Sequence, residues 1–263
     1  EKRGCETAHR SNNGSHAGFC FSRRQCLFCL AGTLPGTAQP TCMQIKRRRN
    51  IITKLWVQDT GYDNTLKAFE TSRKNLGLDY IDLYLIHQPF GDYYGAWRAM
   101  EKLYASGAVR AIGVSNFSAE RLVDLCMNQK VKPMVNQIEL HPFYQQAEAL
   151  KVMALYGVVP QAWGPLAEAQ KHIFEQKTLV KIAASHEKTV AQVVLRWHYQ
   201  RGVPTIPKTI CQERMAENLD IFGFSLCEKE MNAIAALDLG HSEIIDHRCF
   251  YTARQLNSVK IHG

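Results

Sequence analysis

Hydrophobic and polar positions change their period repeatedly between residues 51 and 237. Tyr80–His87 alternates as a half-buried strand does, whereas Tyr94–Ser106 carries apolar residues at helical spacing and stops at Gly107. The same analysis along the chain predicts strands at Ile51–Val57, Tyr80–His87, Val109–Ser115, Met134–Glu139, Val158–Trp163 and Val203–Lys208. It predicts helices at Asp63–Leu76, Tyr94–Ser106, Ala119–Gln129, Gln146–Tyr156, Thr178–Ser185, Val190–Gln200, Glu213–Ile221 and Glu228–Leu237.

This regular alternation indicates an α/β fold with a parallel sheet and helical crossovers. Polar or unusual residues stand at the strand ends, which converge on one face in a closed barrel: Lys54, His87, Ser115, Asn116, Gln137, Trp163 and Lys208. An open doubly wound sheet would bind its ligand behind a glycine-rich loop, but no GxGxxG follows a predicted strand. We therefore expect a (β/α)8 TIM barrel. Only six units are visible, so its first two β/α units are lacking or degenerate.

Charge and cysteine are concentrated at the start of the chain. The net charge of the 263 residues is +8, and +7 of it falls in residues 1–50. That segment lacks the interleaved aromatics of a nucleic-acid site, and its Cys26–Cys29 CxxC has no second pair at zinc spacing. No apolar run reaches the ~18 residues of a membrane span. We expect no nucleic-acid, membrane or metal partner, and we expect residues 1–45 to form an atypical, poorly ordered segment before a domain at 46–263.

Six motifs occur in order, each at a strand end. Taken singly, Lys54 is compatible with an edge cation, His87 with a core histidine, and Ser115-Asn116 with a helix cap. Trp163 alone is compatible with a core residue. The motifs are TKLW (Thr53–Trp56), LGLDYIDLYLIHQP (Leu76–Pro89), GAVRAIGVSNF (Gly107–Phe117), VNQIELHP (Val135–Pro142), QAWGPL (Gln161–Leu166) and IPKTxxxxRMxEN (Ile206–Asn218). Together they resemble the aldo-keto reductase family over about residues 46–263. The closing DHR (Asp246–Arg248) resembles its prokaryotic, diketogluconate-reductase-like branch.

The resemblance implies a barrel that binds NADPH across its C-terminal face and reduces aldehydes and ketones with an Asp–Tyr–Lys–His tetrad. Lys54 matches the family's Lys, His87 its His, and Trp56 would line the carbonyl pocket. The remaining matches concern the cofactor: Ser115, Asn116 and Gln137 on the nicotinamide amide, Trp163 on its ring, Lys208, Thr209 and Arg214 on the 2′-phosphate, and Asn218 on the adenine. Two cations and a hydroxyl suit a phosphate dianion.

The tetrad's Asp and Tyr do not stand where the family has them. The most similar residues upstream are Glu6-Thr-Ala and Ser11, where Glu6 would stand for the Asp and Ser11 for the Tyr. Both lie too far from Lys54 for the family's spacing. A misassigned or frameshifted coding start would explain residues 1–45, and genuine divergence is the alternative. General acid catalysis contributes about 10²–10⁴ in rate. We therefore predict a cytoplasmic, monomeric, NADP-dependent oxidoreductase for small carbonyl substrates with impaired activity. The alternative is a catalytically inactive NADP-binding relic.

Overall fold

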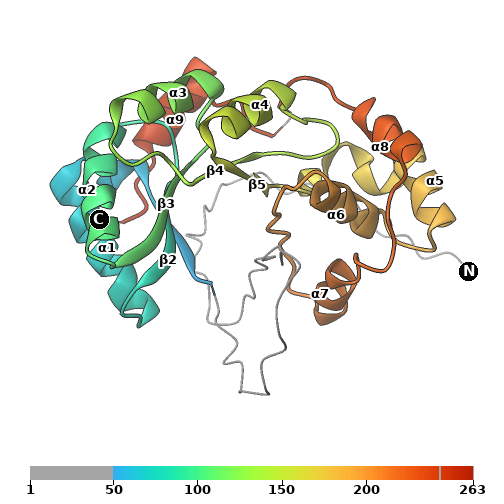
Figure 1. Cartoon of the computed structure of the whole chain (residues 1–263), viewed down its shortest axis with the longest axis horizontal. Helices are drawn as coiled ribbons and strands as arrows, with labels where there is room; N and C mark the ends of the chain where they lie inside the picture. The colour runs from blue at the N-terminus through green and yellow to red at the C-terminus, as the bar shows by residue number, and fades with distance from the viewer. Residues whose placement is uncertain (1–49, 243, 263) are drawn as a thin grey trace, which may run out of the picture.

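The computed structural model describes residues 50–242 and 244–262. Strands and helices alternate along most of this part of the chain (Figure 1). In chain order the elements are β1 (Ile52–Leu55), η1 (Val57–Asp59), α1 (Tyr62–Leu76), β2 (Ile81–Ile86), α2 (Tyr93–Ala105), β3 (Val109–Ser115), α3 (Ala119–Asn128), β4 (Val135–Glu139), α4 (Ala147–Tyr156), β5 (Val159–Trp163), η2 (Ala167–Glu175), α5 (Lys177–Ser185), α6 (Val190–Gln200), α7 (Gln212–Leu219), α8 (Glu228–Ala235) and α9 (Phe250–Ser258).

The five strands form one parallel sheet in the order β1-β2-β3-β4-β5. Helices α1 to α4 lie along one side of this sheet, which curves as an arc in Figure 1. Adjacent parallel strands joined through helices confirm the predicted α/β class. The two barrel units expected to be lacking or degenerate fall before residue 50, outside the described residues.

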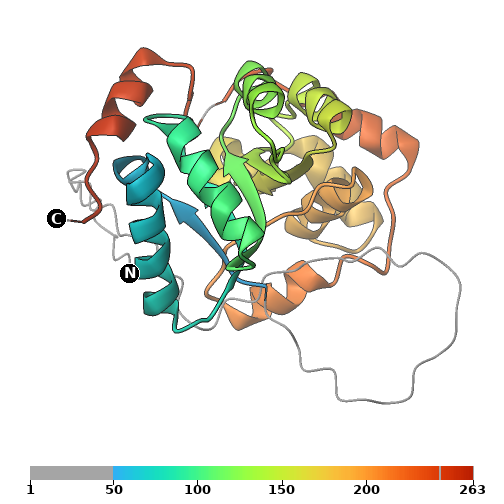
Figure 2. The same cartoon turned by 60° about the vertical axis from the view of Figure 1, so that its left-hand side comes forward.

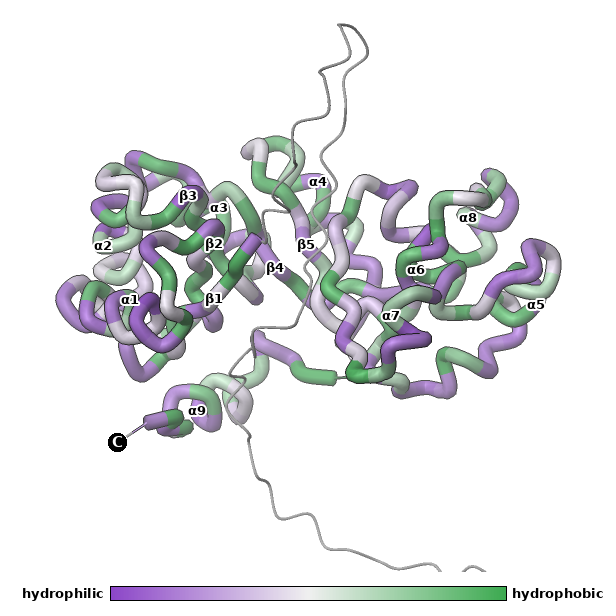
Figure 3. The backbone as a smooth tube through the Cα atoms, turned by 90° about the horizontal axis from the view of Figure 1, so that it is seen from below, coloured by the Kyte–Doolittle hydropathy of each residue, from purple (hydrophilic) through white to green (hydrophobic). Residues whose placement is uncertain are grey.

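One face of the sheet packs against the helices and forms the core. Leu55, Tyr84 and Ile86 point to this side and are buried with Phe69 of α1 and Trp97 of α2. Figure 3 shows hydrophobic and hydrophilic residues in bands along the helices, as expected for elements buried on one side. Because side chains alternate along a strand, the residues between these core positions point to the opposite, inner face.

The predicted strand at Val203–Lys208 is wrong. This segment makes one isolated bridge, between Thr205 and Ala162 of β5, and Pro204 accepts a hydrogen bond from the Ala162 amide at 2.8 Å. Two prolines explain the difference, since Pro204 and Pro207 have no amide hydrogen to donate to a ladder. The segment still runs beside β5, the position that a sixth strand would take.

The end of the chain returns to β1. The indole Nε1 of Trp56 donates to the Val259 carbonyl at 3.0 Å, and Gln58 Nε2 donates to the His262 carbonyl at 2.9 Å. Figure 2 shows α9 and the chain end beside α1. No side chain of α9 is fully buried, and this helix is not among those that the sequence predicts. None of the helices in the described ranges is long and apolar enough to cross a membrane.

Candidate active site

The inner face carries two rows of side chains across neighbouring strands. The register pairs Lys54 with Leu85, Leu85 with Gly113, and Gly113 with Val135. We call these four residues the deep row. Two residues further along the strands lies the upper row, which consists of His87, Ser115, Gln137 and Gln161. The upper row stands at the carboxyl ends of the strands, where β/α folds place their active sites.

Lys54 is a cation in apolar surroundings. Burial alone lowers the pKa of its ammonium group to about 8. Its register neighbour Leu85 is fully buried, and Gly113 next to it has no side chain. Within residues 50–242 and 244–262, no hydrogen bond or ion pair holds the ammonium group. The site therefore keeps Lys54 protonated near neutral pH but close to its titration point.

His87 lies directly above the deep row and is held neutral. Burial, followed by the positive charge of Lys54 and then His247, lowers its pKa to about 3. The Trp56 ring meets it edge to face, with centroids 5.1 Å apart and an angle of 72°. The His87 amide also donates to the Leu55 carbonyl at 2.9 Å, which fixes its backbone next to β1. A neutral imidazole of this kind can donate one N–H to a carbonyl oxygen.

A chain of hydrogen bonds links the ends of β2, β3 and β5. Asn116 donates from Nδ2 to the His87 carbonyl at 3.0 Å and accepts from the Trp163 indole at 2.7 Å. Its backbone has φ 63°, in the left-handed region, which turns this side chain back over the strand ends. Such strained positions are frequent at functional sites.

Ser115 and Gln137 occupy the middle of the upper row, and both are buried. The Ser115 hydroxyl donates to the Gln137 carbonyl at 2.9 Å, and Gln137 Nε2 donates to Gln161 Oε1 at 2.6 Å. Gln137 Oε1 is buried and has no hydrogen-bond partner among residues 50–242 and 244–262. A buried amide oxygen without a donor is costly, so this atom is suited to accept a hydrogen bond from a ligand.

Four of the predicted cofactor residues lie apart from these rows, after the segment that runs beside β5. Thr209 Oγ1 accepts from the Cys211 amide at 3.1 Å just before α7. Lys208 precedes it, and Arg214 and Asn218 belong to α7; Lys208 and Arg214 are exposed. The structure thus separates the predicted residues into a group at the strand ends and a basic group at the start of α7. The first group contains Lys54, Trp56, His87, Ser115, Asn116, Gln137 and Trp163.

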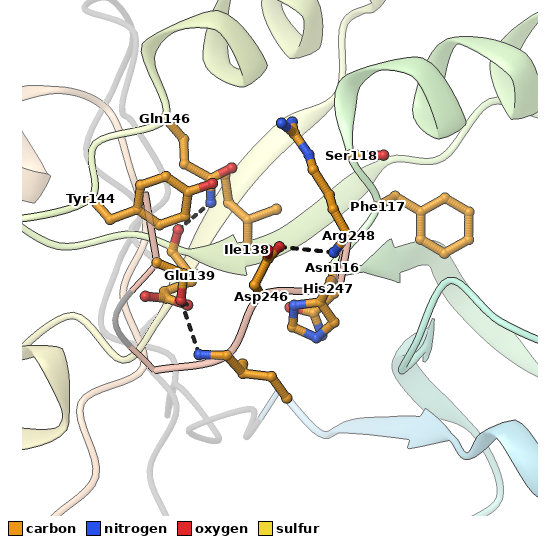
Figure 4. Close-up of a pocket in the computed structure, with 12 residues that line it drawn as sticks. Asn116, Phe117, Ser118, Ile138, Glu139, Tyr144, Gln146, Asp246, His247 and Arg248 are labelled. Atoms are coloured by element: carbon orange, nitrogen blue, oxygen red, sulfur yellow. Dashed lines mark hydrogen bonds between the residues drawn. The ribbon is translucent and has the colours of Figure 1, made fainter. Parts of the chain in front are cut away.

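Residues near the end of the chain also line the site, and the motif analysis gave them no role. A cavity of about 50 Å³ lies between Glu139, Tyr144 and Gln146 on one side and Asn116, His247 and Arg248 on the other (Figure 4). A second cavity, of about 290 Å³, shares Asn116, His247 and Arg248 with it. The DHR motif was the signal available in the sequence, but the packing of this segment against Asn116 depends on the tertiary structure.

Glu139, at the end of β4, binds the segment near the end of the chain through Ser242. Its Oε2 accepts from the Ser242 hydroxyl at 2.6 Å, and its Oε1 lies 3.0 Å from Nε2 of the buried His141. The Ser242 hydroxyl oxygen in turn accepts from the amides of Ile244 and Ile245, at 3.1 and 2.9 Å.

In the part of the chain that the structure describes, no group of three His, Cys, Asp or Glu side chains could hold a metal ion. Glu6 and Ser11, the echo of the tetrad's Asp and Tyr, lie outside the described residues.

Comparison with known proteins identifies relatives over most of the chain. Residues 43–239 match the Aldo/keto reductase family. The chain is 49% identical to the glyoxal reductase of Bacillus subtilis (strain 168) over 189 residues, which cover 72% of this chain and 68% of that protein. It is 42% identical to methylglyoxal reductase DkgA of Yersinia pestis over 193 residues, covering 72% and 69%.

Solved structures give the same result. The aldo-keto reductase MGS-M4, from a deep-sea metagenome library of the Medee basin, superposes with a TM-score of 0.72 at 42% identity, covering 74% of this chain and 75% of that one. A Gox0644 mutant in complex with NADPH superposes with a TM-score of 0.74 at 38% identity, covering 82% and 77%. The family resemblance drawn from the motifs is therefore confirmed: the chain belongs to the aldo/keto reductase family.

Proposed function

We propose that this protein reduces aldehyde or ketone groups of small carbonyl substrates with NADPH. The observation that carries the proposal is the convergence of Lys54, His87 and Gln137 on the inner face, at the carboxyl ends of neighbouring strands. Relatives named as glyoxal and methylglyoxal reductases, and a neighbour solved with NADPH, support the same reaction. The activity belongs to residues 46–263 in this proposal, and the protein acts as a cytoplasmic monomer without a nucleic-acid or membrane partner.

The residues present suit a nicotinamide dinucleotide. The buried, unpartnered Gln137 Oε1 can accept from the carboxamide of the nicotinamide, and the Trp163 indole at the end of β5 offers a flat surface to its ring. Ser115 and Asn116 complete this polar end. At the start of α7, Lys208, Thr209 and Arg214 provide the charges and the hydroxyl for a 2′-phosphate, with Asn218 one turn further on for the adenine.

The substrate carbonyl belongs beside His87. When bound, the reduced nicotinamide supplies a hydride. The neutral His87 ring donates a hydrogen bond to the carbonyl oxygen and so orients it, because the low pKa prevents the ring from being charged. Trp56 packs against His87 and forms an apolar wall of the carbonyl pocket.

Titration with NADPH by tryptophan fluorescence, followed by addition of methylglyoxal, tests this function. We expect NADPH to quench the emission of Trp163, the Trp163→Phe variant to lose most of this quenching, and methylglyoxal to be reduced as NADPH is consumed. Quenching without turnover of any reactive aldehyde would favour the inactive NADP-binding relic. Absence of quenching would contradict the cofactor assignment itself.

A further inference from the structure

The larger of the two cavities adjoins the position proposed for the carbonyl. Its volume of about 290 Å³ is close to the lower end of the range of small-molecule sites, ~300–1,000 Å³. Asn116 lines this cavity and donates to the His87 carbonyl at 3.0 Å. His247 lines it too, and its charge acts on His87 after burial and Lys54 in lowering the pKa of that ring. A substrate whose carbonyl lies beside His87 can therefore extend into this cavity.

Two arginines from separate parts of the chain line the cavity. Arg121 belongs to α3, and Arg248 belongs to the segment near the end of the chain. Arg121 Nη1 donates to the Pro89 carbonyl at 2.7 Å, in the loop after β2. Its guanidinium carbon lies 5.9 Å from the centre of the Phe90 ring and 6.0 Å from that of Tyr93. These contacts hold the charge of Arg121 in place, and the guanidinium has further N–H groups to donate to a ligand.

Arg248 is available to a ligand as well. Its side chain is exposed, and its guanidinium makes no hydrogen bond or ion pair with any residue in 50–242 or 244–262. The neighbouring Asp246 carboxylate accepts from the Arg248 backbone amide at 2.9 Å, and Figure 4 shows the guanidinium pointing away from that carboxylate. The planar fork of N–H groups on an arginine matches the two oxygens of a carboxylate.

The charges around this cavity favour a single negative charge on the ligand. Among the described residues that line it, Glu120 is the only carboxylate, and its Oε1 accepts from the Ser118 hydroxyl at 2.7 Å. Burial is the main cause that lowers the pKa of His247, so this ring adds no charge at neutral pH. Two arginines and one glutamate leave a net charge of +1. That charge balances one carboxylate, whereas a phosphate group carries about −1.5 to −2 at pH 7.

We propose that Arg121 and Arg248 bind a carboxylate of the substrate in this cavity, so that the protein prefers carbonyl compounds that carry an acidic group at their far end. This inference rests on the proposed carbonyl reduction and adds the class of substrate to it. With the carbonyl beside His87, the apolar lining by Phe90 and Phe250 covers the carbon atoms between the two groups. A neutral analogue of the same shape leaves both cations without their anion and therefore binds more weakly.

The test compares the reduction of 4-formylbenzoate with that of its methyl ester, followed by the oxidation of NADPH. Both compounds carry the same aldehyde on the same ring, and the ester lacks the negative charge. We expect kcat/KM for the acid to exceed that for the ester by about 10-fold or more, as charged hydrogen bonds contribute in proteins. High salt should reduce this ratio, because it screens the attraction between the carboxylate and the arginines.

Substitutions should move the ratio of the two kcat/KM values in opposite directions. Arg248→Gln should lower it by about 10-fold, and Glu120→Gln should raise it, because the carboxylate of Glu120 repels the acid. Arg254→Gln, at an exposed position of α9 outside the cavity, is the matched control and should leave the ratio unchanged. Both rates of a ratio come from one preparation, so the fraction of folded protein does not affect it.

A ratio near one in the wild type would overturn the proposal. So would a high ratio that neither Arg248→Gln nor Arg121→Gln lowers, since the acid would then bind elsewhere. If neither aldehyde is reduced, the proposed function fails, and calorimetric titration of the protein with each compound decides the inference separately. Tighter binding of 4-formylbenzoate than of the ester, lost in Arg248→Gln, would support it, whereas equal binding or none would overturn it.

Discussion

Lys54 shows how a single side chain at this site opposes stability. An ammonium group that loses water without gaining a carboxylate destabilises the folded state, and its depressed pKa measures that loss. Natural proteins retain such groups at functional sites at the expense of stability. The same reasoning yields a stability experiment that is independent of catalysis.

Lys54→Met should stabilise the protein at pH 7. A fall of the pKa from 10.5 to about 8 corresponds to at most about 3 kcal/mol, reduced by the partial exposure of the side chain. Because the unfolded chain binds the proton more tightly between pH 8 and 10.5, the wild type gains stability as pH rises through that range. The gain of the variant in urea unfolding should therefore shrink toward pH 10.5. An equal gain at both pH values would contradict the burial of this charge.

Lys208→Ala should discriminate between the two nicotinamide cofactors. A charge-assisted contact to a phosphate contributes about 1.5–3 kcal/mol, so we expect the Kd for NADPH to rise roughly 10- to 150-fold. NADH has no 2′-phosphate and should bind almost as before. Lys229→Ala, on the exposed part of α8, is the control. Equal weakening of both cofactors would disprove the 2′-phosphate assignment.

Gly113 in the deep row leaves no room for a side chain. A β-carbon there would lie 2.5 Å from the Val135 carbonyl oxygen and 2.8 Å from Leu85 Cδ2. Gly113→Ala should thus lower the free energy of unfolding by about 1–3 kcal/mol. Gly223→Ala, with nothing within 4 Å, should change it by less than about 0.5 kcal/mol in the same urea titration. Equal stability of the two variants would show that the sheet yields at this position.

At the level of elements, periodicity located the five strands and most helices, because an alternating or helical apolar stripe is present wherever the element is buried on one side. It failed at Val203–Lys208, where the residues are apolar but the prolines prevent a ladder. The positions of Lys54, His87 and Gln137 followed from their place at strand ends. The place of Glu139 and His247 in the lining of the small cavity could not be predicted. It depends on packing of the segment around Ser242 against β4, about a hundred residues earlier in the chain.

The link between α6 and α7 is a further element-scale feature. Thr189 and Gln192 form a capping box at the start of α6, and the Thr189 hydroxyl also donates to Glu217 of α7 at 2.5 Å. Thr189→Ala should cost about 1–2 kcal/mol in thermal or urea unfolding. Thr71→Ala, at an exposed position in the middle of α1, should leave the free energy of unfolding almost unchanged. A neutral effect at Thr189 would mean that α6 is held by its buried face alone.

The molecule as a whole should lose stability in acid because it buries neutral histidines. His198 is fully buried, and burial lowers its pKa to about 3. Between pH 6.5 and 3 the unfolded chain binds a proton that the folded chain does not, so stability falls as pH decreases through this range. His198→Leu should reduce the slope of unfolding free energy against pH by about 1.4 kcal/mol per unit.

The hydrogen bond from Trp56 to Val259 joins residues 203 positions apart. A ribosome releases a chain from its N-terminus at about 5–20 residues per second. Val259 is therefore synthesised at least about ten seconds after Trp56. By then β1 and β2 have had ample time to pair. Throughout this interval the indole N–H of Trp56, beside His87, lacks the carbonyl to which it donates in the folded protein.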